Sequence, residues 1–177
     1  MPELETQRLL LVPYSLELKK ATLQNRSLLA GLIGVTVPDN WPGPDLMEAL
    51  PFFIELMEQD LSGDIWDGII IHKQDKIVIG DMGFKGGPDA AGLLEIGYSI
   101  IPAYRNQGYA TEMGNSLITW AFQQPGIRAV IAECLDDNAG SIKVLEKLGM
   151  RRLPPDGSML KWEIRKEEWE QREGSYY

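Results

Sequence analysis

The amino-acid sequence predicts a mixed α/β fold in which helices flank a mostly antiparallel sheet. Residues 66–72 and 76–84 are β-rich runs separated by a turn of hairpin length, so we expect them to pair in antiparallel. Residues 95–101 are a third apolar run, which leads through a glycine-bearing turn into a helical pattern. A strand over 127–134 is followed by a short helix over 138–150. Strands and helices that alternate in this way indicate a sheet covered by helices.

The N-terminal part of the chain predicts one strand and two helices. Residues 8–13 have the pattern of a strand that ends at proline. Ser15 is a suitable cap for a helix with leucines as far as Leu32. A loop with three prolines follows over 34–44, and Asp45 then caps a helix whose apolar side holds Leu46, Leu50, Phe53, Ile54 and Met57.

The C-terminal part predicts a turn, a strand and a short helix. Residues 151–157 are typical of a turn, residues 158–164 of a final strand, and the charged tail 165–177 of a helix with a frayed end. No internal repeat, low-complexity segment or linker divides the 177 residues, a length within the range of one domain. We therefore expect a single domain over residues 1–177.

The composition excludes some classes of partner. A formal charge of −9 and a pI near 4.7 argue against a nucleic-acid-binding surface, which is normally basic. An acidic surface favours cationic partners, amines included. The same acidity also serves solubility, and the composition leaves both interpretations open.

No segment predicts membrane insertion or export. The first residues are acidic and lack an apolar core, and no apolar run is long enough to span a bilayer. Cys134 is the single cysteine, so no disulfide forms within the chain, which fits a reducing compartment. It lies in an apolar strand far from His72, the single histidine, and we expect a small buried side chain rather than a nucleophile or a zinc ligand. A cytoplasmic protein without a metal follows from these observations.

The turn over 105–110 has the features of an anion-binding site. It connects a strand to a helix, so the first N–H groups of the helix lack partners and the helix dipole is positive there. Gly108 has no Cβ and allows a ligand to approach the backbone. No Gly-Lys-Ser/Thr follows, which excludes a P-loop, and Gly97 lies inside the strand, which excludes a dinucleotide fingerprint.

Two blocks of this sequence carry a resemblance to a known family. Arg105-Asn106-Gln107-Gly108-Tyr109-Ala110 resembles the acyl-CoA-binding motif of the GNAT superfamily of N-acetyltransferases, Arg/Gln-x-x-Gly-x-Gly/Ala. Residues 138–150 resemble the second GNAT signature, Asn-x-x-Ser and a short helix ending in Glu-Lys-x-Gly-Phe, with Met150 at the Phe position. The opening Glu-Thr-Gln-Arg-Leu-Leu-Leu resembles that of the RimJ/RimL-type branch. The resemblance implies the GNAT fold, with a splayed parallel pair of strands at the acyl-CoA site.

The resemblance also implies where acetyl-CoA binds as cosubstrate. Backbone groups of the strand would pair with the pantetheine arm, at Tyr98, Ser99 and Ile100. The turn would hold the pyrophosphate, through Arg105, Asn106, Gln107, Gly108, Tyr109, Ala110 and Thr111. Asn138 is carried over as a polar contact to the pantetheine, and it is equally suited to capping the helix that follows.

Acetyl transfer to an amine needs a group that accepts the ammonium proton, and a carboxylate is the usual acceptor. Glu95 is the first candidate, because its strand would border the thioester and because Glu95, Gly97 and Ser99 share one strand face. Glu133 and Glu163 lie on other predicted strands and are alternatives. Each of these three glutamates also fits the role of a solvated or ion-paired strand residue.

The proton donor cannot be carried over from the commonest family pattern. Many GNAT enzymes have a tyrosine on the second signature's helix, and Leu145 occupies that position here. In the RimJ/RimL-type branch the serine of Asn-x-x-Ser is implicated instead, which is Ser141 in this chain. Its hydroxyl would donate a hydrogen bond to the departing thiolate, or would only support the start of its helix.

These inferences predict an acetyl-CoA-dependent N-acetyltransferase that acts on a primary amine by direct attack in a ternary complex. A protein N-terminus and a small amine both remain open as acceptors. The alternative is a non-catalytic acyl-CoA-binding regulatory module, which Leu145 keeps open. Trp41 would line the acceptor pocket or pack its proline-rich loop. A homodimer is among the assembly states that the sequence leaves open.

Overall fold

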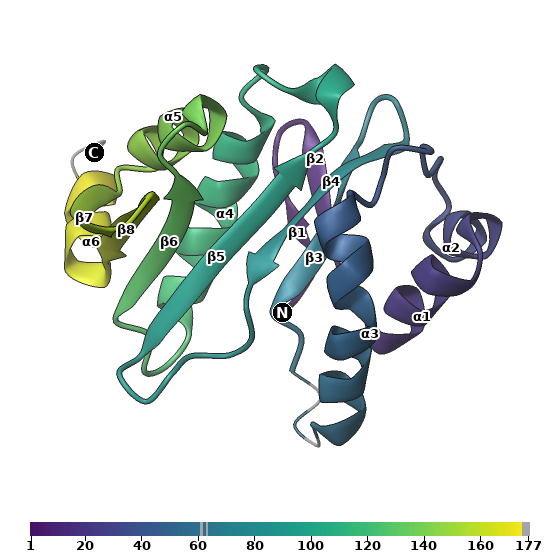
Figure 1. The fold of residues 1–177 in the computed structure, drawn as a ribbon, viewed down its shortest axis with the longest axis horizontal. Coiled ribbons are helices and arrows are strands. Elements are labelled where there is room, and N and C mark those ends of the chain that lie inside the picture. Colours follow the sequence, from purple (N-terminus) through teal and green to yellow (C-terminus); the bar gives the residue numbers. More distant parts are fainter. Residues whose placement is uncertain (61, 63, 175–177) are drawn as a thin grey trace.

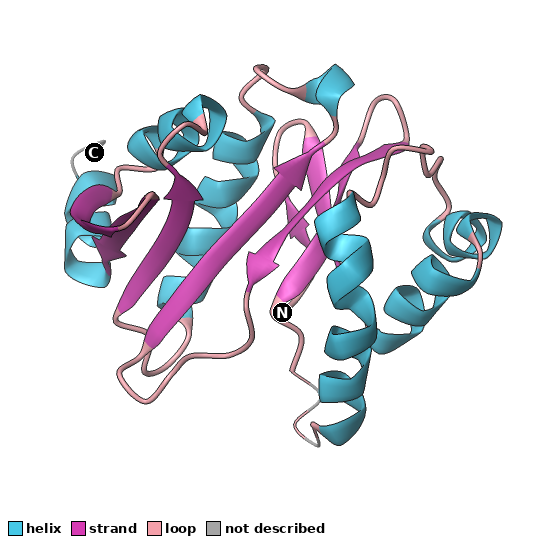
Figure 2. Ribbon diagram, viewed as in Figure 1, coloured by secondary structure: helices cyan, strands magenta, loops and turns pink. Residues whose placement is uncertain are grey.

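The computed structural model describes residues 1–60, 62 and 64–174 and centres on an eight-stranded sheet, shown in Figures 1 and 2. The strand order is β1-β2-β3-β4-β5-β6-β8-β7. The strands are β1 (Leu4–Glu5), β2 (Leu9–Pro13), β3 (Asp67–His72), β4 (Ile77–Phe84), β5 (Leu93–Ile100), β6 (Ala129–Leu135), β7 (Arg151–Asp156) and β8 (Met159–Arg165). Neighbouring strands pair in antiparallel except β5 and β6, which pair in parallel. This confirms the predicted mostly antiparallel sheet with one parallel pair.

The helices lie on both faces of the sheet. They are α1 (Leu16–Gln24), α2 (Arg26–Ile33), α3 (Pro44–Gln59), α4 (Tyr109–Gln123), α5 (Ala139–Lys147) and α6 (Lys166–Gly174), with a short 3₁₀ helix, η1 (Pro102–Tyr104). In Figure 1, α1, α2 and α3 stand together beside β3 and β4, whereas α4 lies behind β5 and β6. Among the described helices, none is both long and apolar enough to cross a membrane.

The sheet is buried because both of its faces carry apolar side chains. Ile69, Ile70 and Ile71 of β3 are all buried, although alternate residues of a strand point to opposite faces. On the α4 side the cover comes from Met113, Leu117, Ile118, Ala121 and Phe122, the apolar positions that predicted the helix. Each fully buried aliphatic side chain of this kind contributes about 1.5–3 kcal/mol.

The first predicted helix is in fact two helices. We expected one helix from Ser15 to Leu32, but α1 and α2 are separated at Asn25, whose backbone is extended at φ −164° and ψ 122°. The Asn25 side chain accepts hydrogen bonds from the N–H groups of Ser27 and Leu28 and so caps α2. An asparagine that satisfies the next helix's free N–H groups stabilises a break.

Two further predictions were wrong in detail. Asp45 is not the cap of α3: Gly43 holds that position and Pro44 opens the helix, which places Asp45 in the first turn. Residues 151–157 are not simply a turn, because β7 pairs with β8 at the sheet edge. The pairing register shifts between Leu153 and Asp156, where two prolines lie, and prolines are tolerated at edge strands.

Candidate active site

The parallel strands β5 and β6 separate partway along their length. Their recorded pairs run from Leu93 with Ala129 to Glu95 with Ile131, and β5 then continues alone on this side as far as Ile100. Within the described residues, Tyr98, Ser99 and Ile100 therefore have no strand neighbour on the β6 side. Backbone amide groups left open at a strand edge pair readily with an extended ligand that carries amides of its own.

The turn that follows β5 presents the uncapped start of α4. Asn106 and Gly108 both have left-handed backbone, at φ 59° and φ 82°, and α4 begins at Tyr109. Among the described residues, no side chain caps this helix start. Free N–H groups in such a concave turn, together with the helix dipole, form an anion site. The predicted residues Ala110 and Thr111 lie in the first turn of α4.

Side chains hold the turn in this shape. Arg105 Nε donates to the Ile100 carbonyl at 2.8 Å, and Gln107 Nε2 donates to the Ala103 carbonyl at 3.1 Å. Arg8, which lies between β1 and β2, also contacts the turn: its Nη2 donates to the Gln107 carbonyl at 3.1 Å. The Arg8 guanidinium lies over the Tyr109 ring, 4.3 Å from its centroid. A cation from the N-terminal segment therefore stands beside the anion site.

Glu112, in the first turn of α4, fixes the position of Arg8. Its Oε2 pairs with Arg8 Nε at 2.6 Å, and its Oε1 accepts from the Thr6 hydroxyl at 2.6 Å and the Arg8 N–H at 2.9 Å. Burial by itself would raise the pKa of Glu112, but these hydrogen bonds and the Arg8 charge outweigh it and hold the pKa below its usual value. The carboxylate therefore stays ionised and tethers α4 to the N-terminal strands.

The start of α5 lies close to β5. Asn138 caps α5, because its Oδ1 accepts from the Ser141 N–H at 3.1 Å. The Tyr98 hydroxyl donates to the Ser141 carbonyl at 3.4 Å, which joins the two predicted site segments. Burial raises the pKa of Tyr98 to about 12, so this hydroxyl keeps its proton at neutral pH. Leu145 and Cys134 are both buried nearby, the cysteine as the sequence predicts.

The three glutamates considered as bases are all ion-paired. Glu95 pairs through Oε1 with Lys85 and its side chain is 28% exposed. Glu133 pairs with Lys161 at 3.8 Å. Glu163 pairs with Arg151, and with Arg165 at 3.2 Å, on the β8 side of the sheet. Glu95 on β5 and Glu133 on β6 both lie on strands that border the gap, whereas Glu163 lies on β8.

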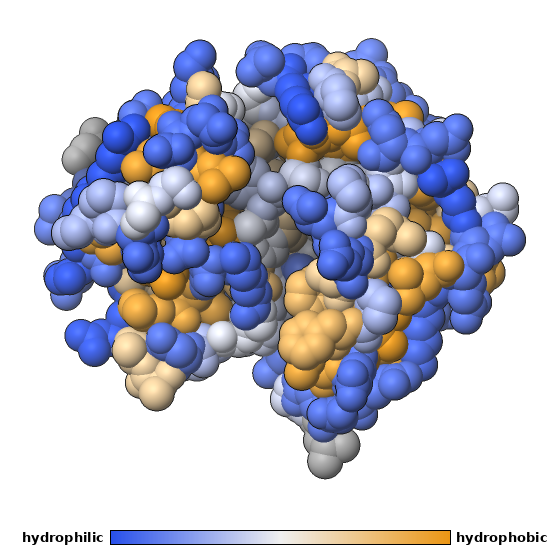
Figure 3. All heavy atoms as spheres, viewed as in Figure 1, coloured by the Kyte–Doolittle hydropathy of each residue, from blue (hydrophilic) through white to orange (hydrophobic). Residues whose placement is uncertain are grey.

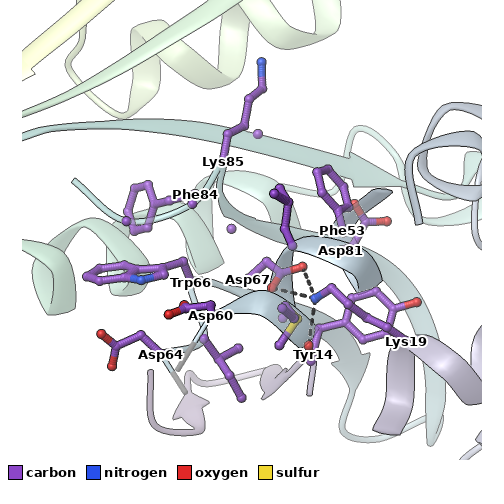
Figure 4. Close-up of a pocket in the computed structure, with 18 of the residues that line it drawn as sticks. Tyr14, Lys19, Phe53, Asp60, Asp64, Trp66, Asp67, Asp81, Phe84 and Lys85 are labelled. Carbon is purple, nitrogen blue, oxygen red and sulfur yellow. Dashed lines mark hydrogen bonds and ion pairs between the residues drawn. The ribbon is translucent and has the colours of Figure 1, made fainter. Parts of the chain in front are cut away.

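A cavity of about 770 Å³ lies on the other side of β5, between the sheet and α3. We call it the α3 cavity. Its walls include Phe53, Leu56, Trp66 and Phe84, and its polar lining includes Lys19, Asp60, Asp64, Asp67, Asp81 and Lys85, as Figure 4 shows in part. The surface in Figure 3 is hollowed between α3 and the β6 side of the molecule. A cavity of this size accommodates a small organic molecule.

Trp41 does not form part of the cavity wall. Its side chain is fully buried, and its Nε1 donates to Asp81 Oδ2 at 2.9 Å. The same oxygen of Asp81 accepts from the Ser99 hydroxyl at 2.6 Å. Trp41 thus supports a carboxylate that lines the α3 cavity instead of lining the cavity itself.

Sequence reasoning missed Arg8, Glu112 and Asp81. Arg8 and Glu112 are 104 residues apart in the chain, so only the fold brings them together. Asp81 offered one weak signal, a charged residue inside an otherwise apolar strand, Ile77 to Phe84. Such a residue usually has a partner or a function, because an unpaired buried charge is unfavourable.

Comparison with known proteins identifies the family. The family model described as an acetyltransferase (GNAT) domain matches residues 8–151. YjdG of Bacillus subtilis (strain 168), described as an uncharacterized N-acetyltransferase, is 35% identical over 147 residues, which cover 82% of this chain and 88% of YjdG. The chain therefore belongs to the GNAT family of acetyltransferases, enzymes that take the acetyl group from acetyl-CoA.

Solved structures support the same fold. RimL, a ribosomal L7/L12 alpha-N-protein acetyltransferase solved in complex with coenzyme A, has a TM-score of 0.67 at 16% identity, over 94% of this chain and 99% of RimL. A ribosomal-protein-S5-alanine acetyltransferase from Vibrio fischeri has a TM-score of 0.64 at 17% identity, over 96% and 99%. At these identities the similarity establishes the GNAT fold.

Proposed function

We propose that residues 1–177 act as a single domain that transfers acetyl from acetyl-CoA to a primary amine by direct attack within a ternary complex. The observation that carries this proposal is the separation of β5 from β6 beside the uncapped start of α4. One ligand can then use both features, an amide-bearing arm along Tyr98 to Ile100 and a pyrophosphate on the 105–111 turn. The other side of β5 has an open cavity for the acceptor.

In this proposal Glu95 accepts the proton of the acceptor ammonium through a chain of water molecules. The amine nitrogen then attacks the thioester carbonyl, the C–S bond breaks, and the sulfur leaves as a thiolate, while the nitrogen loses its second proton to water and the thiolate takes up a proton. Glu95 is suited to this role because it is partly exposed and lies at the point where the two strands separate. The ion pair with Glu95 also keeps the positive charge of Lys85 close to the proposed proton acceptor.

Ser141 is the proposed hydrogen-bond donor to the thiolate. Among the described residues, the Ser141 hydroxyl has no protein hydrogen-bond partner, and the side-chain nitrogen of Asn138 likewise has no protein acceptor. Both donors lie at the start of α5, near Tyr98. They are therefore available to the thiol end of the ligand.

Thiol release from acetyl-CoA, measured with a panel of amines and N-terminal peptides, tests the reaction. Double-reciprocal plots should intersect, as a ternary complex requires; parallel plots, or tight coenzyme binding without turnover of any acceptor, would contradict the proposal.

Two variants test the proposed roles. Glu95→Gln should retain coenzyme binding and lower kcat by roughly 10²-fold, and its rate should recover as pH rises, because free amine then forms without help. Ser141→Ala should also lower kcat, but without that recovery. Glu133→Gln removes the ion-paired glutamate on β6, and a loss of rate in this variant with an unchanged rate in Glu95→Gln would assign the base to Glu133. Rates like those of the unmodified protein in both variants would exclude Glu95 and Ser141 from these roles.

A further inference from the structure

The floor of the α3 cavity is lined by Asp81, Gly83, Lys85 and Gly97, which belong to three successive cross-strand pairs at β4 and β5. Asp81 faces Ser99, and Gly83 faces Gly97. Just beyond β4, the N–H of Lys85 donates to the Glu95 carbonyl at 2.9 Å. Alternate residues of a strand share a face, so these side chains point to the same side. The middle pair, Gly83 and Gly97, has no side chains. The backbone of Gly83 and Gly97 therefore separates the Asp81 carboxylate from the Lys85–Glu95 ion pair.

Two of the charged groups near this floor already have charged partners. Lys19 Nζ lies 2.7 and 2.8 Å from the two oxygens of Asp67, and Lys85 pairs with Glu95. Figure 4 shows the Lys19 amine between Asp67 and Tyr14, whose carbonyl it also contacts. These pairs are neutral overall, so a charged ligand gains little from either of them.

Asp81 differs from both pairs, since its described partners are uncharged. Trp41 and Ser99 both donate to Oδ2, and no described residue donates to Oδ1. Oδ1 is also absent from the buried atoms that lack a partner, which leaves it accessible from the cavity that Asp81 lines. A carboxylate held by two hydrogen bonds on one oxygen has a fixed orientation and one oxygen free for a ligand.

The surroundings of Asp81 favour a cation. Burial raises the pKa of Asp81, and the nearby charge of Asp67 adds to this, against the hydrogen bonds from Ser99 and Trp41. A desolvated carboxylate of this kind is stabilised most by a positive charge brought directly to it. Asp60 and Asp64 also line the cavity, but both are exposed at its mouth, where water and salt weaken their interactions.

The walls add a second requirement, an apolar body. Phe53, Leu56, Met57, Ile65, Trp66 and Phe84 line the same cavity. A small hydrophilic amine would leave these surfaces in contact with water, whereas an apolar group would cover them. Charge on the floor and apolar surface on the walls together describe an amphipathic cation.

Resting on the function proposed above, we infer that the α3 cavity binds a primary amine that carries a bulky apolar group, with its ammonium at Asp81 and that group against the aromatic walls. The same chemistry occurs in a free aralkylamine and in the first residue of a peptide. In this arrangement Asp81 selects the acceptor, and Trp41 and Ser99 position Asp81.

The test measures amine binding instead of turnover, so that it is independent of the proposed reaction. Calorimetric titrations would use the full chain saturated with coenzyme A. We expect 2-phenylethylamine to bind roughly 30-fold more tightly than ethylamine, the scale of burying one phenyl ring. 3-Phenylpropionate, which has the ring but a negative charge, should not bind. A peptide with an N-terminal phenylalanine identifies the source: tighter binding than 2-phenylethylamine would assign the amine to a polypeptide.

Matched variants locate the charge. Asp81→Asn should weaken 2-phenylethylamine binding by roughly tenfold or more, the scale of one charge-assisted hydrogen bond, and leave coenzyme A affinity unchanged. Asp60→Asn removes the same charge from the mouth of the cavity and should change the affinity by less than roughly threefold. Phe53→Ala should reduce the preference for 2-phenylethylamine over ethylamine, and retained coenzyme A binding verifies that this variant folds.

Equal binding of the two amines, or unchanged binding in Asp81→Asn, would overturn the inference even if acetyl transfer is observed. Selective amine binding combined with no acetyl transfer would instead support the inference and contradict the proposed reaction. The amine-binding inference and the proposed acetyl transfer can therefore be contradicted independently of each other.

Discussion

The proposed cofactor side of β5 is formed mostly by backbone groups, whereas the proposed acceptor side is formed by side chains from distant elements. On the cofactor side, the open edge of Tyr98 to Ile100 and the left-handed turn at Gly108 come from one continuous segment. On the acceptor side, Lys19, Trp41, Asp67 and Asp81 come from α1, a loop, β3 and β4. The difference shows that a ligand bound through main-chain groups depends on local conformation, while a side-chain pocket depends on the whole packing.

The largest expected effect is on stability and comes from the acceptor side. Lys19 is 2% exposed and its amine contacts both oxygens of Asp67, so Lys19→Met leaves a mostly buried carboxylate without its cation. We expect the free energy of unfolding in urea to fall by about 3 kcal/mol or more. Coenzyme A affinity of the folded fraction should not change.

Lys20→Met is the matched control. Lys20 pairs with Glu58 at 2.5 Å, but both side chains are nearly half exposed. Surface pairs contribute less than about 1 kcal/mol. Equal losses in the two variants would mean that the buried pair does not organise the acceptor side.

The next effect concerns the cofactor side alone. Gly108 has φ 82°, and a Cβ built there lies 3.6 Å from its nearest contact, Arg8, so Gly108→Val adds backbone strain and fills the space above the turn. Coenzyme A affinity, measured by calorimetry, should fall by roughly 10²-fold, as when two charged hydrogen bonds are lost.

Gly126 provides the control for strain. It has φ 80° with nothing near its Cβ position and lies in the loop before β6. Gly126→Val should therefore suffer comparable strain and keep coenzyme A affinity. If Gly108→Val folds and binds coenzyme A normally, the 105–111 turn is not the pyrophosphate site.

The smallest effect is a pH dependence on the acceptor side. Burial raises the pKa of Asp81 above its ordinary value of 3.8, so the folded state holds this proton more tightly than the unfolded state does. The contribution of Asp81 to stability is then complete below about pH 4 and is lost as pH rises through its folded pKa. Asp67, whose own pKa is raised by burial, and Lys19, which pairs with it, face the same region.

Asp81→Asn removes this titration. The melting temperature of the variant, relative to the unmodified protein, should rise by a few degrees between pH 4 and pH 8. A difference that stays constant with pH would indicate that Asp81 ionises as readily in the folded state as in the unfolded chain.

Local signals in the sequence determined the antiparallel hairpin and the glycine-bearing turn before α4, and the resemblance to the GNAT family supplied the parallel pair. The β-rich apolar runs, the turn before Lys76 and the glycine at 108 specify strands, a hairpin and a turn into a helix through residues close together in the chain. The two family motifs also lie inside single strand–turn–helix units. The break at Asn25 was missed because a capping asparagine within a helical pattern is locally ambiguous.

The tertiary structure decided which polar side chains meet. Asp81 has no sequence neighbour that reveals its role, yet its carboxylate lies between Trp41, forty residues earlier in the chain, and Ser99, eighteen residues later. Arg8 donates to the carbonyl of Gln107 in the 105–111 turn, 99 residues later in the chain. Such contacts depend on strand order and on the packing of α1–α3, which arise from the summed burial of the core, so no short pattern in the sequence encodes them.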